Sequence, residues 1–231
     1  MIELPPEAWG ALRLSLRVSL VATAVAAPLA LLLAHLLARG RFPGRALLDA
    51  AVHLPLVLPP VVTGYALLIL FSPSAPLGRA LDAVGLPLAF RWTGAALAAG
   101  VMALPLMVRP MRLAIEAVDP RLEEAAATLG RSPFVVWRRV TLPLIAPGLL
   151  AGVTLGLAKA FGEFGATITF AASIPGETRT LPAAIYAFLQ VPGRDAAVRG
   201  LVLVALAVSL SAVIVSDVVA RRLARRVAGV G

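Results

Sequence analysis

Long apolar runs alternate along the chain with short segments that carry charge, proline or glycine. A helix rises about 1.5 Å per residue, so about 20 apolar residues cross a hydrocarbon core of about 30 Å. Five runs are long enough, and they lie at residues 14–37, 47–71, 92–108, 142–162 and 199–218. The pattern predicts an all-α integral membrane protein with about five transmembrane helices.

A sixth crossing between residues 165 and 198 is the alternative to this count. The segments TITFAAS and LPAAIYAFL are apolar, but each is too short to cross a bilayer alone. Pro175, Gly176 and Pro182 separate them. We therefore expect an outer-side loop and a short interfacial or re-entrant helix in this region.

Composition agrees with a membrane protein. Hydrophobic residues make up 60% of the 231 positions and charged residues 14%, whereas apolar residues make up about 45–50% of soluble domains. The net charge is +9, but the basic residues cluster at the ends of apolar runs, as membrane topology requires. We expect the lipid bilayer as the surroundings of this chain and no nucleic-acid partner.

Placing alternate loops on opposite sides of the membrane separates the arginines unequally. One side holds thirteen of them, namely Arg39, Arg41, Arg45, Arg109, Arg112, Arg121, Arg131, Arg138, Arg139, Arg221, Arg222, Arg225 and Arg226. The other side holds five, namely Arg79, Arg91, Arg179, Arg194 and Arg199. Basic residues are enriched in cytoplasmic loops. We therefore expect residues 109–141 and the C-terminus in the cytoplasm, and the N-terminus outside.

Two runs carry residues that shape helices and their packing. Pro55, Pro59 and Pro60 in the second run predict a bend, because proline removes backbone hydrogen bonds. Glycines recur at every fourth position of the fourth run, at Gly148, Gly152 and Gly156. Such a ridge lets another helix approach closely, so it predicts a packing seam.

The sequence offers little catalytic chemistry. Its two histidines, His35 and His53, lie near the ends of different runs, and no GxSxG or HExxH pattern occurs. The only lysine, Lys159, stands between alanines, so a Walker A loop for ATP is absent. We expect a transport subunit rather than an enzyme, with no cofactor and no bound metal.

Lys159 and Glu163 are four residues apart near the outer end of the fourth run, so they can pair on one helical face. Charges inside membrane spans are costly and often functional. A pair that neutralises itself at the interface is the favoured interpretation, and a charge that helps an anion pass is the alternative. Under that alternative, Lys159, Glu163 and Thr167 are candidate pathway or gate residues.

The segment EEAAATLGRSPFVVWRRVTLP, residues 123–143, interrupts the apolar pattern. Asp119 and Pro120 form a helix start, and Gly130 is a typical residue after a helix end. Ser132 and Pro133 repeat the start signal. We predict two short cytoplasmic helices with a hinge at Gly130 in the left-handed region, before the fourth span opens at residue 141.

Small and aromatic residues on these helices suit an interface. Ala125 and Ala126 let another backbone approach, while Phe134 and Trp137 lie beside Arg138 in the mixture enriched at protein interfaces. An amphipathic helix on lipid headgroups has the same composition. Composition alone leaves both possibilities open.

The same segment resembles the EAA loop of bacterial ABC-importer permeases, E-A-A-x3-G-x9-I-x-L-P, with Val140 in place of isoleucine. The resemblance implies a loop, residues 119–141, that docks into a groove on a separate ATPase subunit. It also implies which residues couple the two proteins: Glu124, Ala125, Ala126, Gly130, Ser132, Pro133, Phe134, Trp137, Arg138, Leu142 and Pro143.

Other segments look like the molybdate branch of these permeases, among them FPGRALLDAAVHLPLVLPPVVTGYALL and GEFGATITFAASIPGETRTLPAAIYAFLQVPG. This resemblance covers nearly the whole chain, so residues 1–231 are expected to form one permease domain of the bacterial inner membrane. It implies a homodimeric pore, ABC ATPase subunits and a periplasmic or extracellular molybdate-binding protein, with tungstate also accepted. Sulfate and thiosulfate permeases share the EAA loop and GEFG and are the alternative. An ion-coupled secondary transporter is a further alternative.

Overall fold

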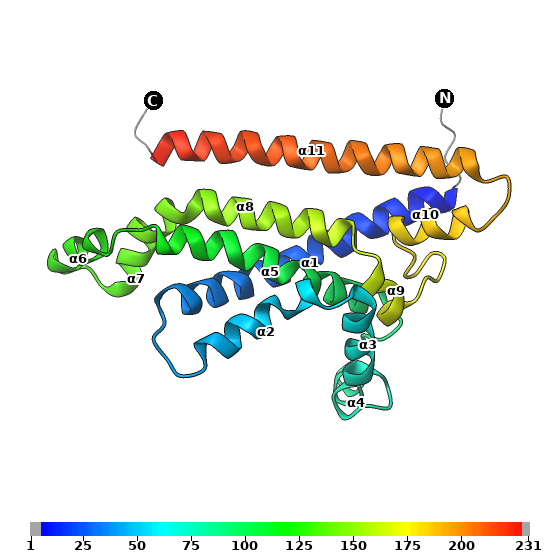
Figure 1. The fold of residues 1–231 in the computed structure, drawn as a ribbon, viewed down its shortest axis with the longest axis horizontal. Coiled ribbons are helices and arrows are strands. Elements are labelled where there is room, and N and C mark those ends of the chain that lie inside the picture. Colours follow the sequence, from blue (N-terminus) through cyan, green and yellow to red (C-terminus); the bar gives the residue numbers. More distant parts are fainter. Residues whose placement is uncertain (1–5, 228–231) are drawn as a thin grey trace.

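The structure, a computed structural model, describes residues 6–227. Four helices in this part are long and apolar enough to cross a membrane: α1 (Pro6–Arg39), α5 (Trp92–Glu116), the helix that contains α8 (Leu142–Phe161), and α11 (Asp195–Val227). They run lengthwise beside one another (Figure 1). No strand occurs among the described residues. The prediction of an all-α membrane protein is confirmed.

The second predicted span, residues 47–71, is broken into α2 (Arg45–Val57) and α3 (Pro60–Phe71), which meet at 116°. Leu58 and Pro59 between them have extended backbones. Each of these two residues precedes a proline, and a residue before proline is pushed out of the helical region. The predicted bend is therefore present, but it is sharp enough to make two helices. Figure 1 shows α3 pointing away from the long helices.

Short helices occupy the loops at the end of the molecule where α5 begins. They are α4 (Pro76–Ala83), α9 (Gly165–Ala171) and α10 (Leu181–Leu189). Neither α9 nor α10 is long enough to cross a bilayer, so residues 165–198 add no sixth span within the described part of the chain. The spans number four, or five when the bent pair α2 and α3 counts as one crossing.

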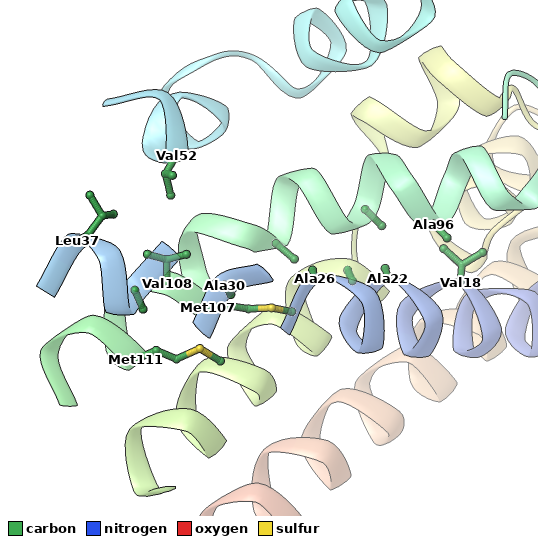
Figure 2. Close-up of a cluster of buried hydrophobic side chains, with 14 of the residues drawn as sticks. Val18, Ala22, Ala26, Ala30, Leu37, Val52, Ala96, Met107, Val108 and Met111 are labelled. Carbon is green, nitrogen blue, oxygen red and sulfur yellow. The ribbon is translucent and has the colours of Figure 1, made fainter. Parts of the chain in front are cut away.

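Small residues bring α1, α5 and α8 together. Ala22, Ala26 and Ala30 form a buried face of α1 against α5, as Figure 2 shows. The α5 helix also packs on the glycine ridge of α8, where Met107 and Met111 lie against Gly152 and Gly156. A Cβ atom added at Gly152 would lie 2.8 Å from the carbonyl oxygen of Met107 and 3.0 Å from Cγ of Met111. The predicted packing seam is confirmed.

At the opposite end, α6 (Pro120–Thr128) and α7 (Pro133–Val136) are followed by a π-helical turn, η1 (Trp137–Thr141). The sequence predicted a fresh start for the fourth span at residue 141, whereas the structure runs from Pro133 to Phe161 as one helix. The N–H of Leu142 donates to the carbonyl of Trp137, five residues earlier. Pro143 has no N–H to donate, so the wider turn accommodates it without ending the helix.

Candidate functional site

The loop between α5 and α8 has the predicted two-helix form. The Asp119 side chain accepts a hydrogen bond of 2.9 Å from the N–H of Arg121 and so caps α6, which begins at Pro120. After α6 ends, Gly130 has a φ of +72°, in the left-handed region. Ser132 and Pro133 then start α7. The predicted hinge conformation at Gly130 is confirmed.

Large apolar side chains on this loop are uncovered. Leu129 is 80% exposed and Phe134 68%, and α6 has no buried residue. Figure 1 shows α6 and α7 projecting beyond the ends of the long helices. Exposed apolar groups that gather in one place typically mark a contact surface for another protein or a membrane.

An open pocket of about 610 Å³ lies between these helices and the end of α1. Four predicted coupling residues line it together, namely Glu124, Pro133, Phe134 and Trp137. Its other lining residues, which the sequence did not predict as coupling residues, are His35, Glu123, Ala127, Arg131, Val136 and Thr141. Of the remaining predicted residues, Ala125 and Ala126 lie on α6, Gly130 and Ser132 between the helices, Arg138 in η1, and Leu142 and Pro143 at the start of α8.

Glu123 joins three elements at this site. Its Oε1 accepts a hydrogen bond of 2.6 Å from Oγ1 of Thr141, which is buried in η1. Its Oε2 lies 3.6 Å from Nη2 of Arg39, the last residue of α1. The same guanidinium nitrogen donates to the carbonyl of Val118 at 3.0 Å, just before α6. Because Glu123 stands one residue outside the EAA pattern, sequence reasoning missed it.

At the other end of α8, Lys159 and Glu163 form the expected pair. Nζ of Lys159 lies 2.6 Å from Oε2 of Glu163, which is 2% exposed. Oε1 of Glu163 accepts the N–H of Ala166 at 3.0 Å, so this carboxylate also holds the start of α9. The Thr167 hydroxyl donates within the same turn, to the carbonyls of Phe164 and Glu163. Both carboxylate oxygens have structural partners, and a role for these residues in a solute pathway stays a prediction.

Residues 26–229 match the family described as "Binding-protein-dependent transport system inner membrane component". The chain belongs to this family. It is therefore a multi-pass inner-membrane transport component, and the expectation of a transport subunit rather than an enzyme is confirmed. The matched residues include the EAA-like loop and the two helices that flank it, α5 and α8. They leave out the first part of α1.

Several curated relatives are transport permeases. The molybdenum transport system permease protein ModB of Escherichia coli K12 is 48% identical, over 96% of this chain and 96% of the relative. The sulfate transport system permease protein CysT of Salmonella typhimurium is 38% identical, over 83% of this chain and 69% of the relative. The alignments with both relatives cover most of this chain. The identity to the molybdenum permease is higher than the identity to the sulfate permease.

Solved structures of ABC transporters share the fold. A bacterial ABC transporter involved in the import of the acidic polysaccharide alginate matches with a TM-score of 0.74 at 21% identity, over 94% of this chain and 80% of that one. The MetNI methionine ABC transporter, in inward-facing conformations, matches with a TM-score of 0.67 at 17% identity, over 94% of each chain. At these identities the likeness concerns the fold alone.

The contact between Glu123 and Thr141 should hold α6 against η1. Thr141→Val keeps the side-chain shape but removes the donor, and a hydrogen bond to a charged group contributes about 1.5–3 kcal/mol. We expect amide hydrogen exchange in residues 120–129 to become about tenfold faster, as measured by mass spectrometry. Thr169→Val is the matched control, because the Thr169 hydroxyl bonds only within its own turn, to the carbonyl of Gly165. Unchanged exchange over residues 120–129 would contradict this role of Thr141.

Proposed function

We propose that this chain is the membrane-spanning subunit of an ABC importer that moves molybdate, and also tungstate, into the cytoplasm. The observation that carries this proposal is the 48% identity to the molybdenum permease of Escherichia coli across nearly the full length of both chains. The sulfate permease relative is less similar and is covered less completely. Sulfate is therefore the second candidate substrate.

The energy for transport comes, in this proposal, from separate ATPase subunits. The exposed apolar residues Leu129 and Phe134 stand on a loop that projects from the bundle and follows the EAA pattern. A projecting surface with apolar anchors beside arginines suits docking to a partner protein. Closure of the ATPase subunits would move this loop and the spans attached to it.

A second copy of the chain would complete the pore. At the break between α2 and α3, Val57 is 81% exposed and Pro59 and Pro60 are exposed beside it. Irregular backbone at membrane depth is tolerated only where protein covers it or where it lines a water-filled cavity. In a homodimer around a central path, the second copy would cover part of the break and the water-filled path would face the rest. This supports placing the break at that path.

The orientation proposed for the chain puts the EAA-like loop in the cytoplasm and α4 outside, as the thirteen and five arginines suggest. The chain has no cysteine, so single cysteines report on one position each. We expect an impermeant maleimide to label Ser74→Cys in intact cells, and Ser132→Cys only after lysis. Both positions are exposed. Labelling of Ser132→Cys before lysis would overturn this orientation.

Gly130 should be required for coupling because of its backbone conformation. A Cβ atom added there meets nothing within 4 Å, so only the φ of +72° opposes substitution. We expect Gly130→Val to cost about 1–2 kcal/mol in the native loop conformation, and to lower the amount of ATPase subunit that co-purifies with the chain. Gly130→Asn is the control, because asparagine tolerates this region better. Equal co-purification of the ATPase with the valine variant would contradict the hinge role.

Reconstitution in proteoliposomes tests the transported ion directly. The chain is combined with its ATPase subunit and with the binding protein loaded by molybdate, by tungstate or by sulfate. We expect ATP hydrolysis and uptake of labelled anion to rise with the molybdate-loaded or tungstate-loaded protein. Stimulation by the sulfate-loaded protein alone would move the assignment to sulfate. Uptake without any ATPase subunit would exclude the importer mechanism.

A further inference from the structure

A stripe of five residues along α1 combines two charges with three apolar side chains. Arg13, Arg17, Val21, Val25 and Leu29 recur at every fourth position, so each lies about one turn from the next, along a row that winds gradually around the helix. All five are exposed. The stripe runs beside the buried alanine face that packs on α5. Arg17 and Arg13 lie about one and two helical turns before Val21, on the N-terminal side of the three apolar residues.

The apolar part of this stripe forms one wall of a groove of about 280 Å³ between α1 and α5. Val21, Val25 and Leu29 line it from α1, and Leu97, Val101 and Leu104 line it from α5. One end of the groove is marked by a contact between the two helices. There the guanidinium carbon of Arg17 lies 3.7 Å from the ring centroid of Trp92, which is next to the groove residue Thr93.

Together with Arg17, the groove extends over about the length of one leaflet. Arg17 and Leu29 are twelve residues apart, which corresponds to about 18 Å along a helix. Half of a hydrocarbon core of about 30 Å is close to this length. Tryptophan and arginine are favoured at the headgroup level of a membrane. In the proposed orientation the groove thus opens at the outer headgroups and ends near the bilayer midplane.

We propose that this groove binds one acyl chain of an anionic phospholipid from the outer leaflet, with the lipid phosphate on Arg13 and Arg17. Neither arginine has an ion-pair partner among the residues that the structure describes. A guanidinium group binds phosphate through paired, charge-assisted hydrogen bonds. Two such groups above an apolar groove favour a lipid with a net negative charge over a zwitterionic one. The site does not depend on which anion the chain transports.

Tryptophan fluorescence tests this site, because Trp92 lies at the mouth of the groove. The chain has three tryptophans, and the variant W9F/W137F leaves Trp92 alone. The full chain is placed in vesicles with a fixed fraction of lipid brominated on its acyl chains, either phosphatidylglycerol or phosphatidylcholine. We expect brominated phosphatidylglycerol to quench Trp92 more strongly, with an apparent preference of about fivefold for each arginine.

Variants separate the headgroup contact from the acyl-chain contact. Arg13→Gln combined with Arg17→Gln should abolish the preference, Arg17→Lys should keep most of it, and Arg199→Gln, an exposed outer-side control, should not change it. Gly100 also lines the groove, so Gly100→Leu should fill it and reduce quenching by both lipids. The arginine variants are compared by the ratio of the two lipids within one variant, and quenching in Gly100→Leu is expressed relative to the same variant in unbrominated lipid, so that changes in Trp92 fluorescence itself cancel.

Four results would overturn the proposal. Equal quenching by the two lipids in the parent would show that the groove does not select anionic lipid. A preference that survives the double glutamine variant would remove the role of the arginines. Weak quenching by both lipids would indicate that protein, such as a second copy of the chain, covers the groove. Unchanged quenching in Gly100→Leu would place the acyl chain elsewhere.

Discussion

Close backbone contact between small residues holds the centre of this protein together. In lipid, a helix gains little by burying a large apolar side chain against another helix, because the acyl chains are equally apolar. Van der Waals packing must supply the attraction, and it grows as backbones come closer. The alanines on one face of α1 and the glycines Gly148, Gly152 and Gly156 on α8 allow both helices to approach α5 closely. The positions of the small residues therefore decide that α5 packs most extensively on α1 and α8.

The irregular backbone of the chain lies away from this three-helix centre. After the break between α2 and α3, α3 points away from the long helices. The two-helix loop with α6 and α7 projects beyond the end of these helices (Figure 1). Both features depend on residues with restricted or unusual backbone geometry, Pro59 and Pro60 in the first case and Gly130 in the second. In the proposed importer, a closely packed centre with irregular segments at the path and at the coupling end would suit alternating access, in which part of the protein moves relative to the rest.

Much of the fold could be predicted, because the length of a membrane span, a proline bend and the end of a helix each depend on one short segment of sequence. The five apolar runs, the bend at the prolines and the left-handed Gly130 each follow from a local pattern. The 116° angle could not be predicted, since it also depends on what α3 packs against. In the structure, a Cβ added at Gly64 would meet the backbone of Ala166 in α9, a contact across a hundred residues. The groove beside Arg17 was hidden for the same reason, because its stripe resembles an ordinary lipid-facing surface until α5 is placed beside it.

The candidate coupling site was predicted in its outline but not in its connections. The EAA pattern identified the loop residues, whereas Glu123, Arg39 and Thr141 come from three separate elements whose proximity leaves no local signal. Their contact has a mechanical consequence. Since α6 buries no residue of its own, apolar packing does not fix its orientation, and the directional bond from Thr141 to Glu123 takes that role. In the proposed importer, a displacement of α6 would act at once on η1, which continues into α8, and through Arg39 on the end of α1. One carboxylate would thus connect the coupling loop to α1 and α8, the two helices that pack most extensively on α5.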